Sequence, residues 1–192
     1  MGRFSISSAW DTIRMRGTHV AWHGLVWHQG RVPKASFCLW LAIRGRLSTS
    51  DRMMIPGANV RCCLCNTEDE SHEHLFFQCE MSTQLWTMML TKCGTLTPTL
   101  AWKDLIGWLA NKWIAGDLKT TSWKLSLAST VYHIWMERNH RLHNRSSNSV
   151  INVRDRVIDM VRWKKASLKG VKPTRENRNI ATAWSLPASL FD

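Results

Sequence analysis

Apolar residues recur at intervals of three and four along most of the chain, which is the spacing of helices that bury one face. The clearest stretch starts at Pro33, a residue type favoured in the first turn of a helix, and carries Phe37, Trp40 and Leu41 on one stripe. This pattern predicts a helix over residues 33–44. The alternation of apolar and polar residues that indicates strands is weak throughout, so we expect an all-α fold.

The same spacing, together with capping residues, predicts a series of further helices. They are expected at residues 9–14, 22–27, 82–90, 102–113, 119–145 and from 150 past 161, with a helix start also at 48–51. The longest of them is expected to bury Leu127, Val131, Ile134, Trp135 and Leu142. Ser149 is expected to cap the helix that begins at residue 150. Beyond Lys169 the periodicity fades, and residues 170–192 are expected to form a tail or linker.

Composition supports a folded chain that stays inside the cell. The 192 residues are 44% hydrophobic and include 12 Trp, enough to fill one substantial core. Charged residues or His interrupt every apolar stretch before it reaches about 18 residues, and no signal peptide is recognisable. We therefore expect no membrane partner and a reducing compartment, the nucleus or the cytoplasm.

Charge is placed unevenly along the chain. The net charge of +12 predicts an anionic partner, RNA or DNA, held by phosphate contacts that do not read sequence. Residues 61–100 depart from this balance with 2 basic and 5 acidic side chains, and they also contain most of the cysteines. Cysteines crowded into one segment of a chain without an export signal indicate metal-bound thiolates and not a disulfide scaffold.

The cysteine-rich segment contains the spacing Cys62-x2-Cys65-x8-His74-x4-Cys79. A Cys-x2-Cys turn directs two sulfurs at one ion, and the later His and Cys complete a tetrahedron. Three thiolates and an imidazole suit Zn²⁺, and four protein ligands leave no position for a reactive water. The sequence therefore predicts a structural zinc site in a zinc-knuckle-like CCHC insertion loop within an irregular helical domain.

Two neighbouring residues are alternative ligands. Cys63 would leave a single residue before Cys65, which is too short for the usual turn. His72 would be further from the Leu75-Phe76-Phe77 run that anchors the second half of the site. We prefer Cys62 and His74.

The sequence lacks the patterns that catalysis requires. No adjacent pair of aspartates is present for a polymerase, acidic residues are scattered and often lie beside Arg, and no glycine-rich phosphate loop or nucleophile elbow occurs. We expect Glu137 and Arg138 to be an exposed charge pair on a helix. The chain is predicted not to be an enzyme.

Basic helices are the expected nucleic-acid contacts, since four carboxylates make the cysteine-rich loop a poor place for phosphate. Arg138, Arg141 and Arg145 follow at i, i+3 and i+7, which predicts one exposed face of the long helix. Further contacts are expected from Arg162, Lys164 and Lys165. The alternative function is a zinc-stabilised protein-interaction scaffold or a non-functional fragment without activity.

Several motifs occur in an order that resembles one known family. They are Phe4-Ser5 through Ser8-Ala9-Trp10, Trp22 to Trp27, Val32-Pro33-Lys34 with Phe37 and Leu39-Trp40, Arg46 through Arg52, the ligand spacing with Glu70-Ser71 and Leu75-Phe76-Phe77, Leu85-Trp86, and Trp135-Met136-Glu137-Arg138-Asn139. Together they resemble the reverse-transcriptase zinc-binding domain of plant LINE-type non-LTR retrotransposon polyproteins, strongly over residues 4–90 and more loosely over 100–165. The resemblance implies a C-terminal extension of a reverse transcriptase that contacts template RNA or target DNA, with the polymerase core as a further partner.

These observations suggest a division of the chain into three parts. Residues 1–95 would form the zinc-binding, reverse-transcriptase-associated domain, residues 96–169 a helical extension, and residues 170–192 the tail or linker.

Overall fold

The computed structural model describes residues 5–13, 17–18, 20–53, 60–94, 102–112, 117–144 and 146–192. Within these ranges the chain is helical and its only strand-like pairing is a single bridge between Arg61 and Asp69. The helical elements are α1 (Ile6–Ile13), α2 (His23–Val26), α3 (Pro33–Ile43), η1 (Ser50–Arg52), η2 (His74–Gln78), α4 (Glu80–Lys92), α5 (Trp102–Lys112), α6 (Leu118–Asn144), α7 (Val150–Ala166), α8 (Arg175–Ala183) and η3 (Ala188–Phe191). None of the described helices combines the length and apolarity needed to cross a bilayer.

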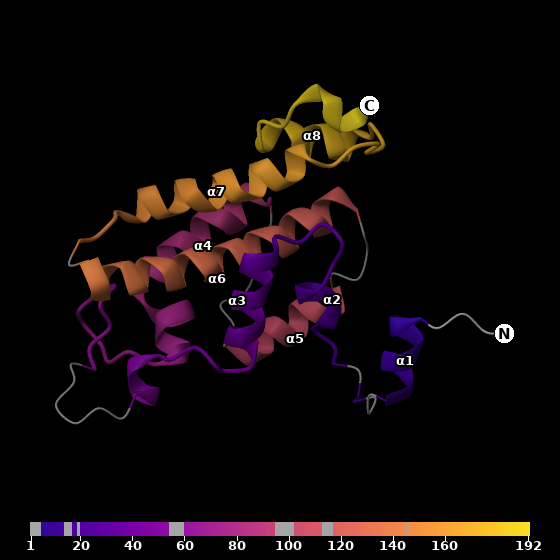
Figure 1. Cartoon of the computed structure of the whole chain (residues 1–192). Coiled ribbons are helices and arrows are strands. Elements are labelled where there is room, and N and C mark those ends of the chain that lie inside the picture. The colour runs from indigo at the N-terminus through magenta and orange to yellow at the C-terminus, as the bar shows by residue number, and fades with distance from the viewer. Residues whose placement is uncertain are drawn as a thin grey trace.

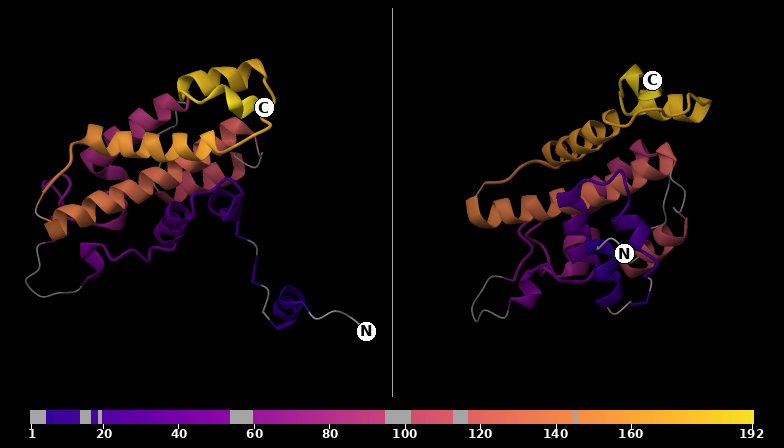
Figure 2. Two further views of the ribbon diagram at one scale, coloured as in Figure 1. Left: turned by 45° about the horizontal axis from the view of Figure 1, so that its top comes forward. Right: turned by 45° about the vertical axis from the view of Figure 1, so that its right-hand side comes forward.

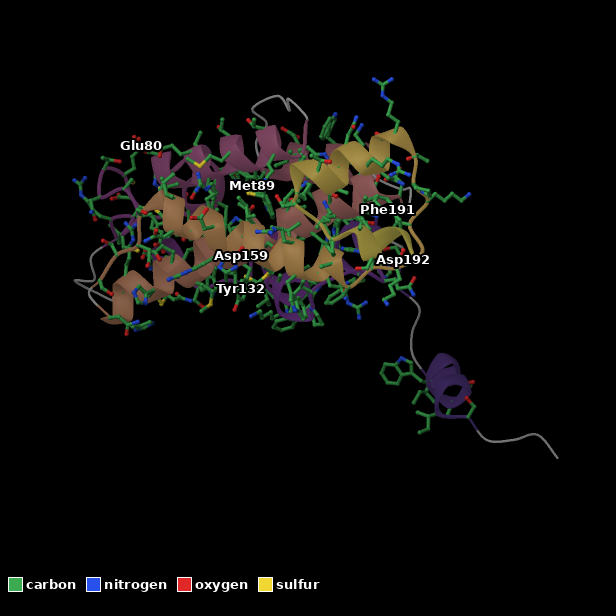
Figure 3. All side chains as sticks on the ribbon, turned by 90° about the horizontal axis from the view of Figure 1, so that it is seen from above. Glu80, Met89, Tyr132, Asp159, Phe191 and Asp192 are labelled. Atoms are coloured by element: carbon green, nitrogen blue, oxygen red, sulfur yellow. The ribbon has the colours of Figure 1, made fainter. Side chains whose placement is uncertain are left out.

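The long helix α6 is the centre of the fold. α7 returns antiparallel to it after a short connection, and α3 packs against another side of α6 (Figure 1). Helix α7, which carries Asp159, packs against both α4, with Glu80 and Met89, and α6, with Tyr132 (Figure 3). Helices α2 and α5 contact each other beneath this layer, whereas α1 stands apart from the bundle in Figure 1 and in the left view of Figure 2. Residues from Leu25 to Trp184 contribute to one hydrophobic core.

Most of the predicted helices are confirmed with small shifts at their ends. The prediction over 33–44 matches α3, which begins with Pro33 in its first turn, and the prediction over 119–145 matches α6. Ser149 caps α7 as expected, because its hydroxyl accepts a hydrogen bond from the Asn152 N–H. The helix start at 48–51 gives only the short turn η1.

Two apolar residues that were expected to be buried are exposed. Phe37 is 53% exposed, because α3 turns a different stripe of mostly small residues toward α6. That stripe consists of Ala35, Cys38, Leu39 and Ala42, and small side chains let two helices approach closely. Leu142 is 44% exposed because it lies near the end of α6, beyond the stretch where Leu127, Val131 and Ile134 are buried.

Residues 170–192 are not an unstructured tail, contrary to expectation. Thr174 caps α8 by accepting a hydrogen bond from the Asn177 N–H, and η3 follows. Trp184 is 1% exposed and Leu190 is fully buried, so this segment packs against the rest of the molecule. The periodicity fades here because single large side chains, and not a continuous apolar stripe, make the contact.

The burial of Trp184 generates a test with a matched control. Replacing a buried Trp by Ala costs about 3–5 kcal/mol, so Trp184→Ala should lower the free energy of unfolding by that amount. Trp163→Ala removes a ring that is 70% exposed and should change it by less than about 0.5 kcal/mol. Urea unfolding of both variants measures the difference. Equal effects would show that residues 170–192 do not pack as described.

Candidate metal centre

The first half of the candidate site is a tight turn. Asp69 pairs with Arg61 across the turn, and the Cys62 N–H donates to the Glu68 carbonyl at 2.8 Å. The Asn66 N–H closes the loop onto the Cys62 carbonyl at 2.8 Å, with Asn66 in the left-handed region at φ 60°. Asn tolerates this conformation better than most residues. The turn therefore brings the side chains of Cys62 and Cys65 to one side.

The second half is the passage from η2 into α4. The Ser71 hydroxyl accepts a hydrogen bond from the His74 N–H at 3.0 Å and so fixes the start of this segment. The Cys79 N–H donates to the His74 carbonyl at 2.7 Å, which closes a wide π-helical turn. That turn places His74 and Cys79 at its two ends, and Cys79 also caps α4.

The four side chains predicted as ligands come together in the structure. Their donor atoms, one each from Cys62, Cys65, His74 and Cys79, all lie within 4.8 Å of one another. The sulfurs of Cys62 and Cys79 are 3.9 Å apart, and Cys65 Sγ lies 3.3 Å from His74 Nε2. The corresponding edges of an ideal zinc tetrahedron are about 3.8 Å and about 3.6 Å, from bond lengths of about 2.3 and about 2.1 Å. The donor set and its spacing therefore fit a tetrahedral metal of zinc's size and softness.

The surroundings favour ionised thiols at two of the three cysteines. The Cys62 thiol donates to Cys79 and, with backbone groups of Ser82 and Met81, lowers the pKa of Cys79 although burial opposes this. Burial also opposes ionisation of Cys65, but hydrogen bonds from the Thr67 hydroxyl, at 3.1 Å, and from the backbone outweigh it and lower that pKa.

The same hydrogen bonds raise the pKa values of the other two residues of the cluster, Cys62 and His74. Donation to Cys79, together with burial, raises the pKa of Cys62. Burial lowers the pKa of His74, yet hydrogen bonding to Cys65 outweighs it, so the pKa is raised overall. The lowered pKa values of Cys65 and Cys79 make it easier for these two thiols to lose the proton that metal binding displaces.

The two alternative ligands point elsewhere. Cys63 directs its sulfur at the Arg138 carbonyl, 3.6 Å away, and takes no part in the cluster. The ring of His72 packs against Phe76 and Trp102, with centroid distances of 5.0 and 5.7 Å. Burial lowers the pKa of His72, as expected for an imidazole held among aromatic rings.

A buried ion pair attaches the candidate metal centre to α6. Arg138 donates from Nη2 to Glu70 Oε1 at 2.7 Å and from Nε to both carboxylate oxygens at 3.1–3.2 Å. The side chains are only 4% and 1% exposed. Ser50 donates two further hydrogen bonds to Glu70 Oε1, from its N–H at 2.8 Å and from its hydroxyl at 3.0 Å. The guanidinium also lies 4.9 Å from the centre of the Trp135 ring, a cation–π distance.

One turn further along α6, Arg141 holds the Cys-x2-Cys turn itself. Its Nη1 donates to the carbonyls of Cys63 and Leu64 at 3.1 and 3.0 Å. Its Nε pairs with Glu137 Oε1 at 2.8 Å, and Asn148 donates to both oxygens of that carboxylate. Burial raises the pKa of Glu137, but these donors outweigh it and lower the pKa overall.

These contacts correct the expectation of an exposed arginine face. Arg138 is 3% exposed and the Arg141 side chain 16%, and both guanidinium groups are used inside the protein. Glu137 and Arg138 are both buried with different partners, so the prediction of an exposed pair is wrong. Helical spacing does not show this, because the loop that carries the cysteine cluster covers the face of α6 that was expected to meet solvent. Arg145 lies outside the described residues.

The remaining basic candidates lie near the end of α7, away from the cysteine cluster (Figure 1). Arg162 is exposed and Lys164 is half-buried. Lys165 is fully buried, with Nζ 4.2 Å from the centre of the Trp184 ring, so it cannot reach a phosphate. Burial lowers the pKa of Lys165 to about 7.

Glu70 and Glu137 help to position the cysteine cluster, a role that the sequence analysis does not predict. It treats the carboxylates of the cysteine-rich loop, Glu70 among them, as charges that repel phosphate, and it expects Glu137 to be exposed. The available signal was position: Glu70 directly precedes Ser71 and the ligand segment, while Glu137 and Arg138 belong to a motif within an apolar helix.

Comparison with known protein families places the cluster in a recognised segment. Residues 4–86 match the family model described as zinc-binding in reverse transcriptase. This segment ends inside α4 and includes all four cluster residues. Neither the curated proteins nor the solved structures give a match.

Removal of the Arg138 guanidinium should be strongly destabilising. Arg138→Met leaves the buried Glu70 carboxylate without its partner, and such a change costs about 3–5 kcal/mol in the free energy of unfolding. Combining it with Glu70→Met should recover a large part of that loss, because no buried charge then remains. Arg154→Met, which removes a partly exposed guanidinium paired with Asp155, serves as the control in the same denaturant titrations. A loss for Arg138→Met no larger than that of the control would contradict the described pairing.

Proposed function

We propose that Cys62, Cys65, His74 and Cys79 bind one Zn²⁺ that stabilises the structure of the chain. The observation that carries this proposal is the approach of all four donors to within 4.8 Å, inside a segment matching a zinc-binding family. A zinc ion would supply a cross-link between the turn at Cys62 and the start of α4. Four protein donors fill a tetrahedron, so the site has a structural role and leaves no coordination position for a substrate.

Zinc content is the direct measurement. We expect about one zinc per chain by elemental analysis, lost in Cys65→Ser and in His74→Ala. Cys63→Ser and His72→Ala should retain it, since those side chains point away from the cluster. Chelation should unfold at least the loop, because structural zinc contributes about 10–16 kcal/mol of apparent binding free energy at neutral pH. Zinc lost in His72→Ala but kept in His74→Ala would overturn the assignment.

We further propose that the zinc-stabilised chain is a non-catalytic module that binds RNA or DNA through phosphate groups. The net charge of +12 and the match to a domain of reverse transcriptases support this. We also propose that the chain derives from a plant LINE-type polyprotein and that its polymerase core is a partner inside the cell. Because Arg138 and Arg141 are used internally, the proposed contacts are Arg162 and Lys164 near the end of α7.

Salt dependence tests this proposal. Binding of the chain to a single-stranded RNA oligonucleotide should weaken steeply as salt rises. Arg162→Ser with Lys164→Ser should flatten the slope by about 0.7 for each phosphate that the variant no longer neutralises. Arg154→Ser with Arg156→Ser removes the same charge from the opposite end of α7 and should leave the slope closer to that of the parent chain. Folding and zinc content are checked in both variants. Absence of binding at low salt would instead support the protein-interaction scaffold.

A further inference from the structure

A lysine-rich cavity lies at the end of the molecule opposite the cysteine cluster. The first turns of α6, the end of α7 and the start of α8 meet there (Figures 1 and 2). The cavity has a volume of about 730 Å³, within the range of small-molecule sites. His28 and Gly30 from the loop after α2 form another part of its wall.

Among the described residues, four lysines and one side-chain carboxylate line this cavity. The lysines are Lys124, Lys164, Lys169 and Lys172. The carboxylate is that of Asp117, which is exposed and already accepts a hydrogen bond from the Thr120 N–H at 2.6 Å as it caps α6. None of the four amines has a hydrogen-bonding or ion-pairing partner among the described residues. The described side chains that line the cavity therefore carry an excess of positive charge.

Lys124 is the most informative of the four. It projects from the middle of the second turn of α6 and is only 6% exposed, yet it lines the cavity and pairs with no acceptor among the described residues. The side chain of Lys124 is mostly buried while it lines the cavity, and burial lowers its pKa, which Asp117 only partly opposes. An anion in the cavity would supply the missing partner.

His28 responds to the same positive environment. Its pKa is lowered to about 4 by burial and by the charges of Lys124, Arg31 and Lys164. An imidazole kept neutral in this way can still donate one N–H to an oxyanion. The side chains thus combine several cations with a neutral donor, a set suited to phosphate.

We propose that this cavity binds phosphate groups, with Lys124 as its buried anchor and Lys169 and Lys172 at its rim. Several phosphates match the charge better than one, since the four lysines exceed the charge of a single phosphate. The phosphates can come from a free oligophosphate compound or from a nucleic-acid backbone, and both share this chemistry. The inference does not depend on the zinc site, but it shares Lys164 with the RNA contact proposed above, so the variants that test it leave Lys164 and Arg162 unchanged.

Inorganic tripolyphosphate is the probe that tests the cavity. The folded full chain should bind it saturably in calorimetry at constant ionic strength, and sulfate should compete only weakly. Lys124→Met should weaken binding at least about tenfold, because a charge-assisted hydrogen bond in a buried site is removed. Lys165→Met is the matched control: that lysine is also buried on a neighbouring helix, but it faces Trp184 and does not line the cavity.

A second pair of variants keeps the test valid if Lys124→Met does not fold. Lys169→Gln with Lys172→Gln changes only exposed rim residues and should weaken binding several-fold, whereas Lys119→Gln, exposed on α6 but outside the cavity, should not. Bound tripolyphosphate should also raise the pKa of His28, measured from the ring-proton shifts by NMR. No saturable binding, or binding unchanged in the rim variant, would overturn the proposal.

The source of the phosphates is resolved by repeating the titrations with a single-stranded RNA oligonucleotide. A parallel loss of RNA affinity in the Lys169→Gln and Lys172→Gln variant identifies the backbone of nucleic acid as the source. Unchanged RNA affinity with weakened tripolyphosphate binding identifies a free oligophosphate. Failure of RNA binding with intact tripolyphosphate binding would contradict the proposed function and leave the cavity's assignment supported.

Discussion

The pairing of Arg138 with Glu70 determines where the candidate metal centre lies. It joins two residues 68 positions apart, and both charges are removed from water. Either one alone would be costly to bury, but together, with two hydrogen bonds from Ser50, nearly all their polar atoms are satisfied. Apolar packing tolerates small slips between surfaces, whereas a bidentate ion pair does not. The loop that carries the cluster therefore has a single position on α6.

This internal use of charge divides the cations of the chain into two groups. Arg138 and Arg141 are used next to the cysteine cluster, where they neutralise Glu70 and Glu137. Glu70 is buried in its pair, and Glu73 accepts a hydrogen bond from the Trp102 N–H at 2.9 Å. Lysines that pair with no described residue gather at the other end of α6, around Lys124. Net charge is a property of composition, but the surface that can meet an anion depends on which charges folding buries.

The sequence predicts the parts of this structure that depend on local geometry. Pro33 and Ser149 mark helix starts because a fixed φ and a hydroxyl cap act within one turn. The ligand residues, including His74 in preference to His72, can also be predicted. All four lie within residues 62–79, and their spacing reflects short turns of the backbone. The role of Arg138 could not be predicted in this way, because its partner is far along the chain and helical spacing cannot show which face another loop will cover. Trp184 was missed because one large side chain can fix a segment without any periodicity.

The Arg138 contact also determines which part of the chain could be transferred to another protein as a folded unit. The cluster residues lie within a short stretch, which suggests a cassette that could be cut out and placed in another protein. Such a cassette would carry the Glu70 carboxylate without its guanidinium, and the carbonyls of Cys63 and Leu64 would lose their donor, Arg141. The smallest portable unit therefore extends well past the segment that matches the family model and includes α6 as far as its final turns. In recombination between proteins, as in engineering, the loop and this helix have to move together.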